Sequence, residues 1–69
     1  MPIGYLIDVL EALKYAGYNT TRLRREHILS EATIQALREQ RNISMESLAV
    51  ICRILNCQPG DVIFFYNEG

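Results

Sequence analysis

Apolar residues recur at intervals of three and four along much of this chain, which is the spacing of one face of an α-helix. Near the N-terminus the members of this face are Ile3, Leu6, Leu10 and Leu13. The pattern predicts an amphipathic first helix over about residues 3–16. Gly17 follows directly, at the point where a residue with a left-handed backbone commonly ends a helix.

The next three helix starts share one signature, in which an apolar residue precedes a polar N-cap and another apolar residue lies four positions after the cap. The three copies are Tyr18-Asn19 with Leu23, Leu29-Ser30 with Ile34, and Ile43-Ser44 with Leu48. The apolar pair packs across the cap as a hydrophobic staple, and the polar side chain accepts a hydrogen bond from a first-turn amide. The sequence therefore predicts helices over about 19–26, 30–39 and 44–56.

The last of these helices is followed by a turn and then by a dense apolar run. The residues that the helix turns inward are Leu48, Ile51, Cys52 and Leu55. Pro59 cannot continue a helix, so residues 58–61 are predicted to form a turn. The run over 62–66, Val-Ile-Phe-Phe-Tyr, is compatible with one more helical turn followed by a short strand.

This apolar run has two possible positions. An exposed run of this kind is an aggregation hazard in a monomer, so Phe64, Phe65 and Tyr66 are candidate dimer contacts. Alternatively, the run folds back onto the first helix, against Leu6 and Leu10. We favour a shared role, in which some side chains point inward and others pair with the same tail of a second copy across a two-fold axis.

The charge of the chain is unevenly distributed. The 69 residues suffice for one domain over 1–69, and the net charge is −1. Residues 19–41 hold five arginines against three glutamates, a local charge of +2, and the rest of the chain carries −3. A basic face on an acidic body is typical of a nucleic-acid contact. The alternative is that these arginines simply solvate a small pair of helices.

The sequence gives little support to other kinds of chemistry. One histidine, His27, and two cysteines, Cys52 and Cys57, provide too few ligands for a zinc site and no nucleophile with a base beside it. We therefore expect no enzyme activity, no metal and no cofactor, and no small-molecule ligand is evident. No apolar stretch approaches the roughly 20 residues of a membrane span, and no signal peptide is evident. The expectation is a cytoplasmic protein.

Two segments carry a resemblance to a known family. They are Leu-Ser-Glu-Ala-Thr-Ile-Gln-Ala-Leu-Arg over 29–38 and Ile-Cys-Arg-Ile-Leu-Asn-Cys-Gln-Pro-Gly-Asp over 51–61. With the helix starts described above, the chain resembles the small phage-repressor-type (Xre-like) helix-turn-helix regulators over about residues 5–64. The resemblance implies a compact all-α domain of four or five helices, with the helix-turn-helix at 19–39. Such domains bind operator DNA, commonly as homodimers.

The resemblance also implies which residues contact DNA. The base-reading positions fall on Glu31, Ala32, Gln35 and Ala36. The phosphate-contacting positions fall on Thr20, Thr21, Arg22, Arg38 and Arg41. Gln35 could pair with adenine, Glu31 could accept a hydrogen bond from a cytosine amine, and the alanines could touch a thymine methyl group. Glu31 has an equally good alternative role, because an acidic residue in a first helical turn is favourable.

Three positions depart from the family pattern. Arg24 stands where the family usually has a small residue, so this side chain must extend out of the helix pair or change its packing. Ile28 stands at the glycine of the turn and Gln40 at another frequent glycine. Because isoleucine does not easily adopt positive φ, the turn must be built differently from the glycine version.

Two functions fit these observations. The first is a sequence-specific, dimeric DNA-binding regulator, a bacterial repressor of phage or mobile-element type. The second is an interaction or accessory module of the same fold, antitoxin-like or assisting recombination, that does not read bases. The salt dependence of DNA binding separates the two, because only phosphate contacts produce a steep one.

Overall fold

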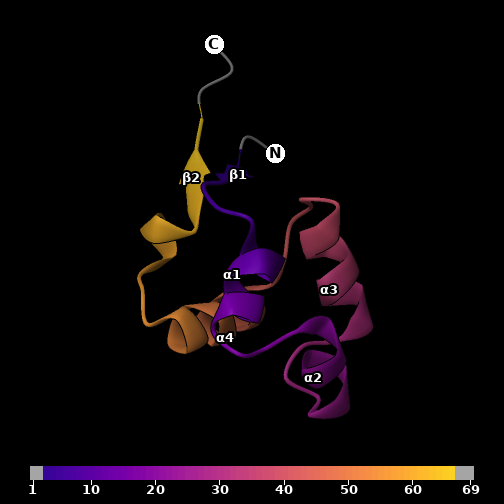
Figure 1. The fold of residues 1–69 in the computed structure, drawn as a ribbon. Coiled ribbons are helices and arrows are strands. Elements are labelled where there is room, and N and C mark those ends of the chain that lie inside the picture. Colours follow the sequence, from indigo (N-terminus) through magenta and orange to yellow (C-terminus); the bar gives the residue numbers. More distant parts are fainter. Residues whose placement is uncertain (1–2, 67–69) are drawn as a thin grey trace.

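The structure is a computed structural model that describes residues 3–66 (Figure 1). Its elements are β1 (Ile3–Tyr5), α1 (Val9–Tyr15), α2 (Thr20–Arg25), α3 (Glu31–Arg38), α4 (Met45–Leu55), the 3-10 helix η1 (Pro59–Asp61) and β2 (Ile63–Phe65). The chain is thus a small helix-turn-helix fold of four helices with a two-stranded sheet. The structure is mostly helical, as the expected all-α class implies, and the short C-terminal strand that the sequence allowed is present. The N-terminal strand was not predicted.

The first helix begins later than the sequence pattern predicted. Residues 3–5 form a strand, and α1 begins at Val9. The helix starts there because Asp8 is its N-cap: Oδ1 of Asp8 accepts a hydrogen bond from the Glu11 amide at 3.2 Å. A carboxylate in this position satisfies one of the amides that a helix leaves unpaired and complements the positive helix end.

The inward face of α1 also differs from the predicted stripe. Val9 and Leu13 are buried, four residues apart, whereas Leu10 is half-buried and Leu6 is 54% exposed. The prediction was wrong because the same apolar positions suit a short strand followed by a short helix. Only the distant partner strand decides between the two.

The three predicted helix caps are confirmed. Asn19 accepts a hydrogen bond from the Arg22 amide at 2.8 Å. Ser30 and Ser44 accept in the same way from the residues three positions on, at 3.2 and 3.1 Å. The apolar residue four positions after each cap is buried, namely Leu23, Ile34 and Leu48. The helix starts thus follow from local sequence.

Left-handed residues form the turns between the helices. Gly17 after α1 has a φ of 93°, as the sequence predicted. In the turn between α2 and α3 the residue with positive φ is His27, at 54°, and not Ile28. The turn is thus built differently from the glycine version, with an exposed histidine, a residue type that tolerates this conformation better than a β-branched one. Gln40 keeps the left-handed conformation of a glycine position, with a φ of 57°.

The C-terminal run returns to the N-terminus. β2 pairs with β1 in antiparallel register, Ile3 opposite Phe65 and Tyr5 opposite Ile63, and the Leu6 amide donates to the Val62 carbonyl at 2.8 Å. Val62 is fully buried. The predicted fold-back therefore occurs, but onto a strand rather than onto the first helix. Phe64, Phe65 and Tyr66 remain 40%, 69% and 42% exposed.

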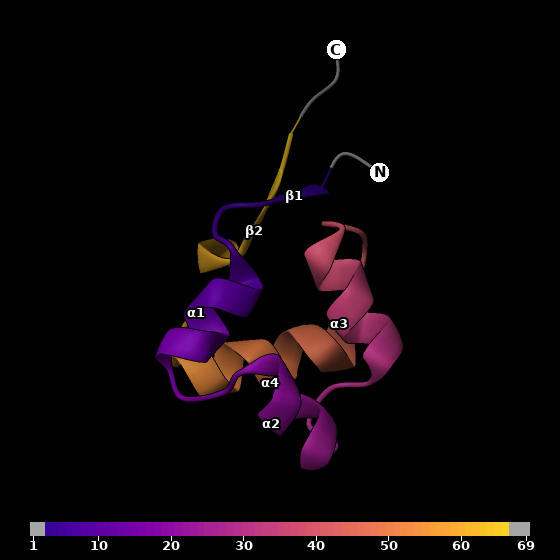
Figure 2. The ribbon, with the colours of Figure 1, turned by 45° about the vertical axis from the view of Figure 1, so that its right-hand side comes forward.

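The sheet and α2 lie in different parts of the molecule, whereas the residues after α3 reach the sheet: the Tyr5 hydroxyl donates to the Arg41 carbonyl at 2.6 Å. In Figures 1 and 2 the two strands lie at the upper end, and α2 lies at the lower end beside the start of α3. Within residues 3–66, no helix is long and apolar enough to cross a membrane.

Gly4 gives a test of the strand pairing. A Cβ atom on Gly4 would lie 2.8 Å from two ring atoms of Phe64, whose ring packs 5.7 Å from that of Tyr66. Gly4→Ala should lower the free energy of unfolding by about 1 kcal/mol, because the ring must leave this position. Urea unfolding measures the change.

The control for this prediction is internal. In a Phe64→Ala background, Gly4→Ala should change the free energy of unfolding only slightly, because the clashing ring is absent. Gly60→Ala should change stability by less than about 0.5 kcal/mol, since no heavy atom lies within 4 Å of the added Cβ. An equal cost of Gly4→Ala in both backgrounds would contradict the packing described.

Candidate nucleic-acid interface

α2 and α3 form a pair with a buried inner face and a polar outer face. Leu23 from α2 and Ile34 and Leu37 from α3 are buried, as predicted. The start of α3 is exposed at Glu31 and Ala32. An exposed helix start of this kind is the part of a helix-turn-helix that can approach base edges in a major groove.

The other two expected base-reading residues are less accessible. Gln35 is half-buried, and only 7% of Ala36 is exposed. Ala36 lines a surface hollow together with Ala32 and Gln35, so its small exposed fraction lies on the side of α3 that carries the other expected base-reading residues. The most accessible members of the expected set are Glu31 and Ala32, with Gln35 and Ala36 less exposed beside them.

Glu31 forms an ion pair with an arginine on the other helix. Arg24 Nε lies 2.5 Å from Glu31 Oε2, and Arg24 Nη2 donates to Oε1 at 3.1 Å. The arginine thus extends out of the helix pair, as its position required, and 43% of its side chain is exposed. Sequence reasoning treated Arg24 only as a departure from the family pattern. The ion pair shows that it belongs to the same surface as the start of α3.

Gln35 belongs to a second set of paired side chains at the end of α3. Its Nε2 donates to Glu39 Oε2 at 2.5 Å, and its Oε1 accepts from Arg38 Nη1 at 3.2 Å. Arg41 Nε lies 2.9 Å from Glu39 Oε1. The hydrogen bond from Gln35, and then the charge of Arg41, lower the pKa of Glu39. DNA would therefore have to replace exposed internal hydrogen bonds, which contribute little individually.

The expected phosphate-contacting residues fall into two groups. Thr20, Thr21 and Arg38 line one surface hollow, together with Lys14 and the acidic residues Asp8 and Glu11. Arg41 lines another, on the outer side of α3, with Ala32 and Gln35. Residues expected to read bases and one expected to contact phosphate thus lie together in the second hollow. The first hollow carries two basic and two acidic side chains.

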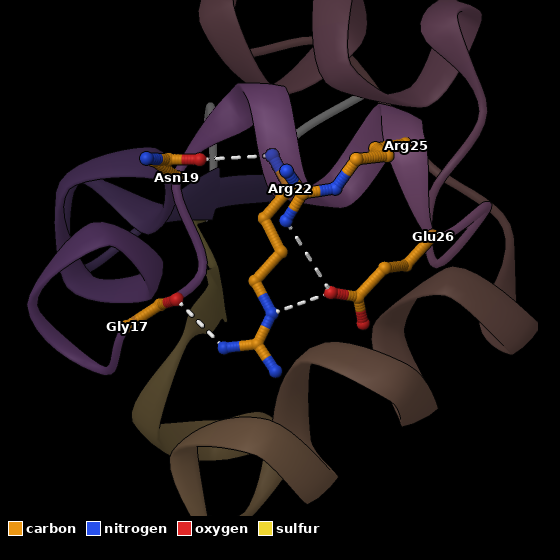
Figure 3. A network of polar contacts seen from close by, with 5 residues as sticks. All are labelled: Gly17, Asn19, Arg22, Arg25 and Glu26. Carbon is orange, nitrogen blue, oxygen red and sulfur yellow. Dashed lines mark hydrogen bonds and ion pairs between the residues drawn. The ribbon is translucent and has the colours of Figure 1, made fainter.

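Arg22, the remaining expected phosphate contact, is engaged in holding the turn before α2 (Figure 3). Its Nε donates to Glu26 Oε2 at 2.8 Å, and its Nη1 donates to the Gly17 carbonyl at 3.0 Å. Its guanidinium carbon also lies 4.2 Å from the ring centre of Tyr18, a cation–π geometry. The contacts to Gly17 and Tyr18 connect the segment after α1 to α2, and the pair with Glu26 runs along α2 itself, so Arg22 supports the local structure.

The two cysteines lie in and just after α4, outside the helix pair. Both Cys52 and Cys57 are free and half-buried. Burial, followed by the neighbouring Cys57, raises the pKa of the Cys52 thiol, which lowers its thiolate content. Among residues 3–66 no group of three or more His, Cys, Asp or Glu side chains is placed to hold a metal ion.

Two short helices joined by a tight turn, with the second exposed at its start, define a helix-turn-helix domain. A family model described as the Cro/C1-type HTH DNA-binding domain matches residues 9–68, and the chain belongs to this family. The match confirms the resemblance to Xre-like regulators, and the family is one of DNA-binding regulators rather than of enzymes. Comparisons with curated proteins and with solved structures gave no match.

The structural role of Arg22 can be tested by a substitution that keeps its charge. Arg22→Lys removes the forked contacts to Glu26 and Gly17 and weakens the stacking on Tyr18, because a lysine ammonium has neither the planar shape nor the reach of a guanidinium. We expect a loss of about 1 kcal/mol in the free energy of unfolding, measured by chemical denaturation.

Arg25→Lys is the matched control. Arg25 lies three residues further along α2, its side chain is 70% exposed, and its Nη2 lies 3.8 Å from Glu26 Oε2. Its replacement should leave stability within about 0.3 kcal/mol of the wild type. Similar losses for both variants would show that the network around Arg22 does not hold the turn.

Proposed function

We propose that this protein is a sequence-specific transcriptional regulator that binds operator DNA as a homodimer, and that it acts as a repressor of phage or mobile-element type. The observation that carries the proposal is the exposed start of α3, which lies among exposed arginines in a domain of a DNA-binding family. Occupying an operator with a compact dimer blocks access of other proteins to the same DNA.

Electrostatics supports DNA as the partner. The exposed arginines around α2 and α3 are Arg24, Arg25, Arg38 and Arg41. Phosphate contacts need only donors and positive charge, which Arg38, Arg41 and the threonines at the start of α2 supply. The proposed base contacts come from the start and middle of α3, where Ala32 offers a methyl group and Gln35 an amide.

A dimer is proposed because one small module buries too little surface for tight and specific binding. β1 occupies only one edge of β2, and Phe65 on this strand is 69% exposed. We propose that two copies pair through Phe64, Phe65 and Tyr66 across a two-fold axis. Such an interface is self-complementary, and it places two α3 helices on symmetric half-sites.

Selection from a pool of random duplex DNA at near-physiological salt tests DNA reading. We expect a palindromic motif with half-sites about one helical turn apart. Arg38→Ala and Arg41→Ala should each reduce the log–log salt slope of binding by about 0.9 per protomer, because each removes a phosphate contact.

Arg53→Ala is the control for this measurement, since Arg53 lies in the last turn of α4, outside the helix-turn-helix, and should leave the slope unchanged. An unchanged slope for Arg38→Ala and Arg41→Ala would reject the proposed phosphate face. No DNA binding by the folded protein would favour an interaction module instead.

Sedimentation equilibrium tests the proposed dimer. Phe65→Glu should convert a dimer into a monomer at micromolar concentration, because it places charges within an apolar interface. Tyr15→Glu replaces an aromatic residue that is 85% exposed at the end of α1, and it should leave the dimer intact. A wild-type protein that sediments as a monomer, alone and on DNA, would reject the dimer.

A further inference from the structure

We propose that Arg24, held in place by Glu31, reads a guanine in each half-site. This inference rests on the proposed DNA-binding function and specifies its chemistry. The residues come from different helices of the pair, Arg24 from α2 and Glu31 from the first position of α3. Their ion pair therefore lies at the exposed helix start that faces the DNA in the proposed complex.

The ion pair uses only one side of the guanidinium group. Arg24 directs Nε and Nη2 toward the carboxylate, with Nε 2.5 Å from Oε2 and Nη2 3.1 Å from Oε1. A guanidinium has five N–H donors, so three remain, one on Nη2 and two on Nη1. These form the end of the group, where two N–H donors point in parallel.

This remaining donor pair matches one base edge in the major groove. Guanine presents two adjacent acceptors there, O6 and N7, and a parallel pair of N–H groups satisfies both. Adenine presents an acceptor beside a donor, so one N–H of the arginine would face another N–H. The parallel N–H groups of Arg24 therefore favour guanine over adenine.

The carboxylate determines both the orientation and the preference for a base. A free arginine at this surface would move among many rotamers and would be attracted to any phosphate. When Arg24 is paired with Glu31, the carboxylate largely offsets the charge of the guanidinium. The attraction of this guanidinium to a phosphate is then weak, and a neutral base edge with two acceptors becomes the better partner. Glu31 is thus a positioning residue, because its oxygens face Arg24 rather than a cytosine amine.

Exposure allows the contact. The side chain of Arg24 is 43% exposed and that of Glu31 is 65% exposed, so the pair stands on the surface. Ala32, the next residue of α3, has a small exposed side chain that leaves room beside the pair. A guanine edge could therefore approach the guanidinium without displacing a neighbouring long side chain.

The test measures base preference at single positions of the selected motif. The wild type, Arg24→Met and Glu31→Gln are each used to select from random duplex DNA. Binding is then measured on the wild-type motif with its guanines replaced singly by adenine or by 7-deazaguanine, which lacks N7. Circular dichroism confirms that each variant is folded, and Arg24→Lys provides a second variant that keeps the charge.

For the wild type, replacing the guanine that Arg24 reads should weaken binding about five- to 150-fold. With Arg24→Met the same replacement should change binding less than twofold, and this guanine should disappear from the selected motif while other positions remain. Arg24→Lys, which can still donate to guanine but lacks the planar fork, should keep a smaller preference than the wild type. Glu31→Gln should reduce the preference several-fold. Arg25→Met, the control on the next residue, should leave the preference intact.

Two results would overturn the inference, and they have different meanings. If the wild type selects a motif and Arg24→Met selects the same one, Arg24 does not read a base, and the proposed DNA-binding function stands without it. If the folded wild type selects no motif, the proposed function fails and this inference fails with it.

Discussion

The fold depends on a common centre to which α1, α2, α3 and α4 each contribute one fully buried side chain. Leu13 comes from α1, Leu23 from α2, Ile34 from α3, Ile51 from α4, and Val62 from the segment before β2. A domain of this size buries a smaller share of its surface than larger domains do, so each of these contacts matters. The position of α3, and with it the candidate interface, is set by this centre.

Because apolar side chains form the core, the polar side chains of α2 and α3 form hydrogen bonds and ion pairs with one another at the surface. Arg24 pairs with Glu31, and Gln35 with Glu39. Exposed pairs of this kind contribute little to stability, so a ligand can replace or use them at small cost. Arg22 differs, since two contacts tie it to the turn before α2 and a third joins it to the end of the same helix. Among these arginines, Arg22 thus supports the local fold, whereas Arg24 lies in an exposed ion pair at the surface.

The features that local sequence determines were predicted, and those that depend on distant partners were not. Asn19, Ser30 and Ser44 cap helices within a few residues, so the starts of α2, α3 and α4 could be read directly. β1 forms only because β2 returns beside it, nearly sixty residues later. The ion pair between Arg24 and Glu31 likewise depends on a turn whose left-handed residue is His27, which no pattern in the sequence indicated.

The separation of the sheet from α2 and the start of α3 has a functional consequence. The β1–β2 sheet and α2 lie at opposite ends of the molecule (Figures 1 and 2). Contacts made by the exposed aromatic residues of the tail therefore leave Arg24 and the start of α3 free. Within each copy the core connects the tail to the helix pair. If two tails were held in a fixed arrangement, the two helix pairs would therefore also have a fixed relative position. In a dimer of the proposed kind, the sheet would set the spacing of the half-sites, and the helix pair would determine which bases are read.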